Sequence, residues 1–173
     1  MDLSFGIFVV PFIALTLIIT LFIHFLKKVA DKRNYKYFIV TTAIAAFVLN
    51  FGWEVVQGPL YENFEYDFEH VSFCALASIA DMLMVLVLLF LFGLIYNNVY
   101  WIKRLKFTRT LTLILIGFLG AILAELWHTW RGDWSYADTM PMLPLVEVGI
   151  SPVLQFSVLP LIIFVISRRA LKP

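Results

Sequence analysis

Residues 37–59 read YFIVTTAIAAFVLNFGWEVVQGP, and this stretch decides the fold class. A helix needs about 20 mostly apolar residues to span a bilayer, and residues 37–57 supply that length. Asn50, Glu54 and Gln57 follow one another at i, i+4 and i+7, so a helix places all three on one face. A polar face on a membrane helix must meet protein or a water-filled cavity. The stretch therefore predicts a spanning helix that contributes one wall of a polar site.

The composition agrees with a membrane protein. Hydrophobic residues make up 62% of the 173 residues and charged residues 14%. Soluble domains are nearer half apolar and a quarter charged. The net charge of +1 provides no basic surface for nucleic acid, and the single cysteine excludes an intrachain disulfide or a CxxC site.

Four more segments have the length and apolar character of the first. The predicted spans are residues 3–26, 37–57, 71–96, 110–130 and 145–166. No basic stretch precedes residues 3–26, and this segment is too long for the core of a signal peptide, so it is predicted to be a permanent span. The fold class is therefore an all-α polytopic membrane protein, a single helical bundle over residues 1–173.

The basic residues predict an orientation. Of the 13 Lys and Arg, all except Arg131 lie in residues 27–36, 97–109 and 167–173, which are alternate ends of the spans. The positive-inside rule places these ends in the cytoplasm, with the N-terminus out and the C-terminus in. We expect an integral protein of the bacterial cytoplasmic membrane whose partners are the lipid bilayer and a lipophilic small molecule. The oligomeric state is left open.

Titratable residues on four predicted helices are the candidates for chemistry. Asp81 lies near the middle of its span, and Glu54 lies one turn before the end of its span. Glu147 is expected to share a helix face with Ser151 and Gln155, in a fifth helix that Pro152 and Pro160 interrupt. The candidate catalytic residues are Glu54, Asp81, Glu125, His128 and Glu147. The candidates for binding substrate or orienting the acids are Asn50, Trp53, Gln57, His70, Ser78, Trp127, Trp134 and Gln155.

Carboxyl groups inside a bilayer are costly. A charged residue at a helix centre costs about 3 kcal/mol even on the mildest scale. Several such groups at similar depth are hard to explain by packing alone. A carboxylic acid that keeps its proton near neutral pH is a proton donor, so the set predicts acid–base chemistry.

Each candidate also has a structural alternative. The acids can form hydrogen bonds between helices, the histidines can lie at the membrane interface, and the tryptophans can belong to an aromatic belt. Glu125-x-x-His128 has the spacing of helix-borne di-iron sites, so a metal-dependent enzyme is a further alternative. Only one such pair occurs and histidine is scarce, so we predict no metal and no cofactor.

The polar motifs also carry two resemblances. The chain first resembles a widespread family of small bacterial integral membrane proteins, which implies no particular function. This resemblance covers nearly the whole chain and is carried by Asn50-x-x-Trp53-Glu54-x-x-Gln57-x-Pro59-Leu60-Tyr61, His70, Asp81, Glu125, Gly132-x-Trp134-x-Tyr136, Met140-Pro141 and Gly149-x-Ser151-Pro152-x-x-Gln155.

The second resemblance is to membrane cyclases and covers about a third of the chain. Residues 131–136, RGDWSY, followed by residues 143–147, LPLVE, are similar to motifs of the integral-membrane lycopene cyclase domain, although Val146 stands where that family has the first of two adjacent glutamates. Asn50-x-x-Trp53-Glu54 is similar to a motif of fungal membrane-bound terpene cyclases. This resemblance implies that Glu54 and Asp81 protonate an isoprenoid.

The clustered acids and the resemblance to cyclases lead to the same expectation. We expect the protein to be a membrane enzyme, a cyclase or isomerase, that acts on an isoprenoid or polyene through these acids. Protonation of an alkene creates a carbocation that aromatic rings stabilise and that water must not reach. A proton-coupled transporter or a lipid-binding membrane protein is the main alternative.

Overall fold

The computed structural model describes residues 9–171 and is helical, as predicted. Within this range it has five helices long and apolar enough to cross a membrane, consistent with an integral membrane protein. They are α1 (Val9–Lys28), α2 (Lys32–Gln57), α3 (Phe68–Ile95), α4 (Phe107–Arg131) and α5 (Ile150–Ser167). The predicted residues 3–8 of the first span lie outside the described range.

Helices α2, α3 and α4 each begin before the apolar run that predicted them, and aspartates cap the first two. Asp31 caps α2, its side chain accepting a hydrogen bond from the backbone N–H of Asn34 at 2.9 Å. Asp67 caps α3 through the backbone N–H of His70 at 2.8 Å, and this bond and one from the His70 ring lower the pKa of Asp67. Such caps satisfy otherwise unpaired N–H groups, so the helices extend into polar sequence.

The fifth helix corrects the prediction. It begins at Ile150, because residues before it form a hairpin of β1 (Met142–Leu143) and β2 (Val148–Gly149). Glu147 lies in the turn of this hairpin, is exposed and has a φ of 52°. The expectation that Glu147 shares a helix face with Ser151 and Gln155 is therefore wrong. Neither proline interrupts α5, which continues to Ser167.

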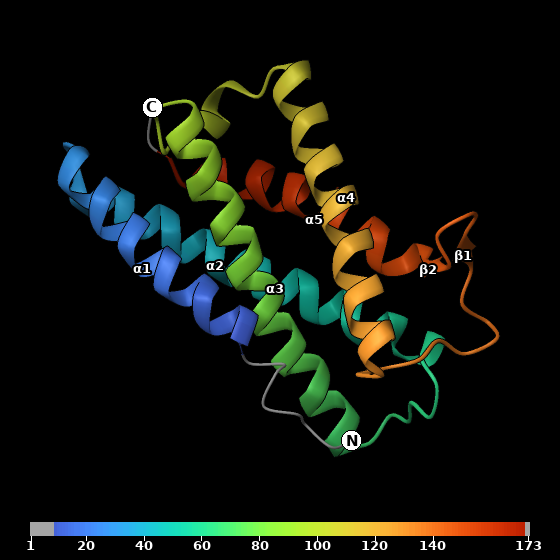
Figure 1. Cartoon of the computed structure of the whole chain (residues 1–173). Helices are drawn as coiled ribbons and strands as arrows, with labels where there is room; N and C mark the ends of the chain where they lie inside the picture. Colours follow the sequence, from blue (N-terminus) through green and yellow to red (C-terminus); the bar gives the residue numbers. More distant parts are fainter. Residues whose placement is uncertain (1–8, 172–173) are drawn as a thin grey trace.

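The helices pack in pairs around α2, α3 and α5. Helix α2 packs along α3 and α5, α1 packs along α3, and α4 packs mainly along α5 (Figure 1). The main core lies among α1, α2, α3 and α5, and includes Phe38, Leu89, Phe90 and Phe164, all fully buried. A smaller apolar cluster joins α4, the hairpin and α5 at Ala121, Val148 and Val153.

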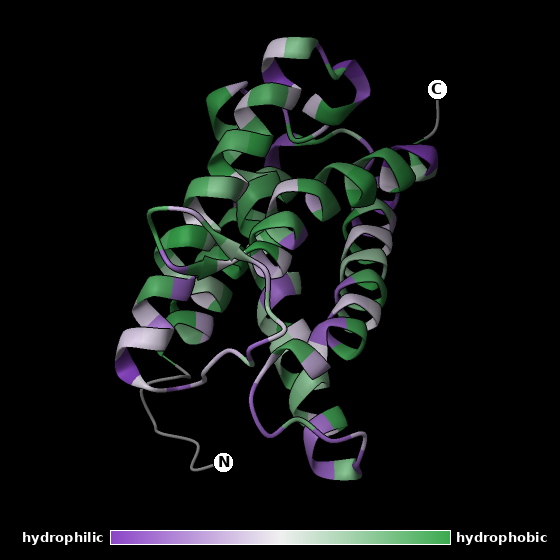
Figure 2. Ribbon diagram, turned by 90° about the vertical axis from the view of Figure 1, so that its right-hand side faces the viewer, coloured by the Kyte–Doolittle hydropathy of each residue, from purple (hydrophilic) through white to green (hydrophobic). Residues whose placement is uncertain are grey.

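The two ends of the bundle differ in sequence. The basic end carries the connection between α1 and α2, the 3-10 helix η3 (Trp101–Arg104) and the 3-10 helix η4 (Arg168–Ala170). The hairpin end carries the 3-10 helix η2 (Gly58–Leu60), residues 61–67 and residues 132–149. Hydrophilic residues gather at these ends and in the connections, while the helices between are mainly hydrophobic (Figure 2). Many apolar side chains are exposed along the helices, as expected for surfaces that face lipid.

Helices α4 and α5 approach closely at Gly117. A Cβ at this position would lie 2.0 Å from the backbone oxygen of Phe156. We expect Gly117→Ala to force the helices apart and to lower the free energy of unfolding by about 1–3 kcal/mol. The matched control is Gly120→Ala on the same helix, where nothing lies within 4 Å and stability should be kept or raised. Denaturant unfolding in mixed micelles measures both, and equal stabilities would contradict the close approach.

Candidate functional site: a carboxyl pair and a third acid

Two carboxyl groups from different helices meet at one amide nitrogen. Gln155 on α5 is 1% exposed, and its Nε2 lies 2.9 Å from Oε1 of Glu54 on α2 and 3.0 Å from Oδ2 of Asp81 on α3. The same nitrogen lies 3.1 Å from Oδ1 of Asn50. The two carboxyl groups are also close enough to interact with each other. Asp81 is the fourteenth of the 28 residues of α3, so it lies midway along that helix, and Glu54 and Asp81 are both half-buried.

Gln57 completes the network and fixes its orientation. Its Nε2 donates to Glu54 Oε1 and to Gln155 Oε1, each at 2.9 Å. Its Oε1 accepts from Trp53 Nε1 at 3.1 Å and from the Ser151 hydroxyl at 2.8 Å. Both hydrogens and both acceptor positions of the Gln57 amide are used. These bonds determine on which side the amide oxygen lies and on which side the nitrogen lies.

The network has fewer donors than acceptors at the carboxyl groups. The Gln155 amide has two hydrogens, and three oxygens lie within 3.1 Å of its nitrogen. Gln57 already donates both of its amide hydrogens, one to Glu54 and one to Gln155. No buried side-chain nitrogen or oxygen among the described residues lacks a partner. A contact between two carboxyl groups is attractive only when one of them supplies a hydrogen.

A third acid lies in the same part of the bundle. Glu125 on α4 is buried, and its Oε2 accepts from the Tyr136 hydroxyl at 2.5 Å and from Trp134 Nε1 at 3.2 Å. Tyr61 lies near these acids: burial, followed by the charges of Glu125 and Glu54, raises the pKa of its phenol. Burial and the Glu125 carboxylate likewise raise the pKa of Tyr136.

The two connections of the hairpin end pack onto each other and position these aromatic side chains. Tyr61 and Tyr136 form an antiparallel bridge, with the backbone N–H of Glu62 bonded to Ser135 O and that of Ala137 bonded to Leu60 O, each at 3.0 Å. The Tyr61 ring lies 5.6 Å from that of Tyr136 and 6.4 Å from that of Trp134 between centroids. Two segments far apart in the sequence thus bring three aromatic side chains together beside Glu125.

The structure brings together most, but not all, of the predicted site residues. The network contains Asn50, Trp53, Glu54, Gln57, Asp81 and Gln155, and the third acid has Trp134 as a partner. Other candidates have partners of their own. Ser78 donates to Cys74 O, His70 contacts Asp67, His128 contacts Asp133, and Trp127 is exposed beside Trp130.

Three residues outside the predicted site set belong here. Ser151 is expected on the correct helix face but is not among the predicted site residues. Tyr61 fits an aromatic belt from its place in the sequence, and Tyr136 enters only as part of a resemblance. The position of the two tyrosines depends on the bridge between two loops, which no local pattern in the sequence reveals. The one signal for Tyr136 is the aromatic spacing after Gly132 and Trp134.

The metal alternative lacks a ligand set. Among residues 9–171, no three His, Cys, Asp or Glu side chains gather in a way that could hold a metal ion. In the Glu125-x-x-His128 pair, the histidine Nδ1 lies 2.7 Å from Asp133 Oδ2 and its ring stacks on Trp134, while Glu125 is bonded to Trp134 and Tyr136. The spacing therefore reflects two separate polar contacts.

No protein family, curated protein or solved structure matches this chain. The resemblances to cyclases therefore stay predictions, and the candidate site stands on the geometry of its own residues.

The bond from Tyr136 to Glu125 gives a local prediction. Tyr136→Phe keeps the ring against Tyr61 but removes one of the two donors to a buried carboxyl group, so we expect a loss of about 1–3 kcal/mol in unfolding free energy. The control is Tyr66→Phe, because Tyr66 is exposed and contacts Phe64 through its ring. If both variants unfold like the parent in a denaturant titration, Glu125 does not depend on Tyr136.

Proposed function

We propose that this protein is a membrane-embedded acid–base enzyme, a cyclase or isomerase, acting on a lipophilic isoprenoid or polyene. The observation that carries the proposal is the contact between Glu54 and Asp81 at the Gln155 nitrogen. Two like charges so close in a poorly hydrated site repel strongly, and the network supplies too few donors for both. The pair therefore holds one proton between its two carboxyl groups. Such a proton is available for transfer to a substrate.

The proposed reaction needs no net oxidation or reduction. The carboxyl pair adds its proton to one carbon of an alkene, and the new C–H bond leaves a carbocation on the neighbouring carbon. In an isomerase, loss of a proton from a carbon next to the cation then forms a shifted double bond. In a cyclase, another alkene of the same molecule first attacks the cation and closes a ring, and loss of a proton follows. Glu125 is the candidate base, and the Tyr61, Trp134 and Tyr136 rings are candidates to stabilise the cation.

The lipophilic character of the substrate follows from where the site lies. The acids are carried by helices whose apolar composition suits a bilayer, and the apolar surface around them is extensive. We propose the bacterial cytoplasmic membrane as the location, with the N-terminus out and the C-terminus in. In this orientation the basic end is cytoplasmic and the hairpin end, which lies nearer to Glu54 and Glu125, is external.

The test is expression in a host that makes linear carotenoids or terpenoids. We expect a cyclised or double-bond-shifted product of unchanged mass in extracts of cells with the wild-type chain. An empty vector and a chain with Glu54→Gln and Asp81→Asn together are the controls. Identical product profiles in all three would overturn the proposal for these substrates.

Proton-coupled transport is the second candidate, and one observation favours it. The Tyr136 hydroxyl bonds to Glu125, and burial and the charges of Glu125 and Glu54 raise the pKa of Tyr61, so two phenols from the loops lie near the acids. A chain of such groups suits proton movement. Proton uptake into liposomes carrying the purified protein, lost in Asp81→Asn, would favour transport over the enzyme.

A further inference from the structure

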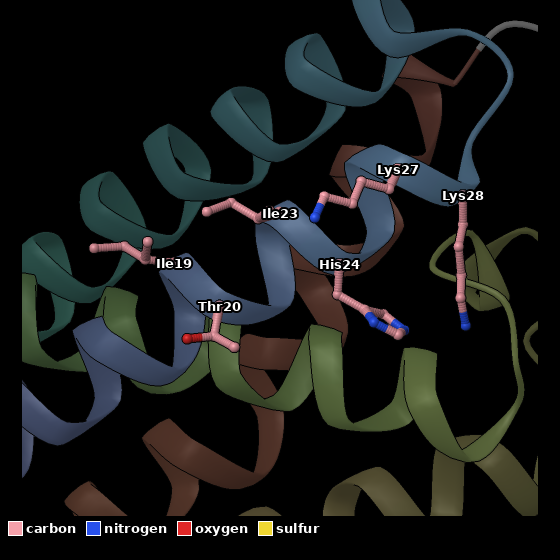
Figure 3. Close-up of a pocket in the computed structure, with 6 residues that line it drawn as sticks. All are labelled: Ile19, Thr20, Ile23, His24, Lys27 and Lys28. Atoms are coloured by element: carbon pink, nitrogen blue, oxygen red, sulfur yellow. The ribbon is translucent and has the colours of Figure 1, made fainter.

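A hollow on α1 lies away from the acids and has a different chemistry. Its lining residues all come from this one helix: Ile19, Thr20, Ile23, His24, Lys27 and Lys28. Figure 3 shows them as two rows, with Ile19, Ile23 and Lys27 along one edge and Thr20, His24 and Lys28 along the other. Residues four apart form ridges on a helix, so the hollow is the groove between two neighbouring ridges.

The groove faces away from the protein. The opposite side of α1 is buried through Ala14, Ile18, Leu21 and Phe25, and α1 packs along α3. Ile19 and Ile23 are 51% and 45% exposed. In a helix that spans a bilayer, this outward face meets lipid molecules.

The groove changes from apolar to basic along its length. Ile19 and Ile23 line one end, and His24, Lys27 and Lys28 line the other. Neither lysine forms an ion pair with any residue of the described chain. Both amino groups are exposed and free to bind an anion, and long lysine side chains at a helix end reach toward the headgroup layer.

The length of the groove matches one leaflet. From Ile19 to Lys28 the helix rises about 13.5 Å at 1.5 Å per residue. Half the hydrocarbon thickness of a bilayer is about 15 Å. The groove thus runs from near the bilayer centre to the boundary at the basic end, as an acyl chain and its headgroup do.

We propose that this groove is a binding site for one anionic phospholipid. An acyl chain lies along Ile19 and Ile23, and the headgroup phosphate binds Lys27 and Lys28, with His24 at its side. The charge at one end and the apolar surface at the other suit an amphiphile with a negative head better than a zwitterionic lipid, whose ammonium group would meet the same lysines. This site is independent of the acid pair and of the proposed reaction.

Native mass spectrometry of the protein released from nanodiscs tests the proposal. The discs contain equal amounts of phosphatidylglycerol and phosphatidylcholine with the same chains. We expect wild type to retain one phosphatidylglycerol in preference to phosphatidylcholine. We expect the Lys27→Gln, Lys28→Gln variant to lose this preference by about thirtyfold, since each of the two basic residues near the surface contributes about 1 kcal/mol.

Two further variants distinguish lipid binding in the groove from a general effect of the protein's net charge. Arg168→Gln with Arg169→Gln makes the same charge change on exposed residues of the basic end, outside the groove, and should keep the preference. Thr20→Phe fills the groove without changing charge and should reduce retention of phosphatidylglycerol. Equal retention of both lipids by wild type, or equal loss in the two charge variants, would overturn the proposal. Displacement of the lipid by added inorganic phosphate alone would overturn it too, since it would show an anion site without the acyl groove.

Discussion

Asp81→Asn and Glu54→Gln should each reduce product formation by about 10²–10⁴-fold, the range by which a positioned acid or base accelerates a reaction. Each substitution keeps the size of the side chain and removes one carboxyl group of the pair. Without the second carboxyl group, the remaining acid no longer shares a proton at the Gln155 nitrogen. The measurement is the rate of product formation in membranes supplied with the linear substrate, normalised to the amount of folded protein.

The control for this prediction is a carboxyl group outside the network. Glu65 lies in the connection between η2 and α3 and is exposed, so Glu65→Gln should keep the wild-type rate. If Asp81→Asn and Glu54→Gln keep the wild-type rate as well, the pair has no part in the chemistry. If all three variants lose the product equally, the loss is not specific to the pair and the prediction fails.

Gln155→Leu should lower stability more than any other single substitution proposed for this protein. The amide is buried, donates toward Asn50, Glu54 and Asp81, and accepts from Gln57. Leucine fills a similar volume but leaves several buried polar groups without a partner, and each such group costs about 1–3 kcal/mol. We therefore expect the free energy of unfolding to fall by about 3–5 kcal/mol, as when other buried polar networks are broken.

Ser157→Ala is the matched control on the same helix. Ser157 is buried, and its hydroxyl bonds to Val153 O within α5 rather than to another helix. Its removal should cost no more than about 1 kcal/mol. Denaturant unfolding of both variants in mixed micelles gives the comparison. Similar free energies for the two would show that Gln155 does not join the three helices.

The helices and most of the pair could be predicted from the sequence because both depend on local patterns. Apolar runs of spanning length predict the helices. The spacing of Asn50, Glu54 and Gln57 places them on one face of α2, and Gln155 is expected to share a face of α5 with other polar residues. These residues do meet, since a membrane helix turns its polar side chains toward protein.

The rest depends on contacts that no single segment encodes. The prediction for Glu147 is wrong because its apolar neighbours look like the start of a helix, whereas the backbone there turns in a hairpin with positive φ at Leu145 and Glu147. Tyr61 and Tyr136 join the acids only because their loops pair with each other. The partner of His128 is Asp133, just after the end of its own helix, which the Glu125-x-x-His128 spacing does not indicate.

The most direct test of the shared proton is an infrared spectrum of the protein in nanodiscs at neutral pH, recorded in a Glu125→Gln background to remove the third acid. A proton shared by Glu54 and Asp81 predicts a carbonyl band of a protonated carboxylic acid that shifts in deuterium oxide. This band should be lost or moved in both Glu54→Gln and Asp81→Asn. A spectrum without any protonated carboxyl band, or a band that neither substitution alters, would contradict a proton held between the two acids.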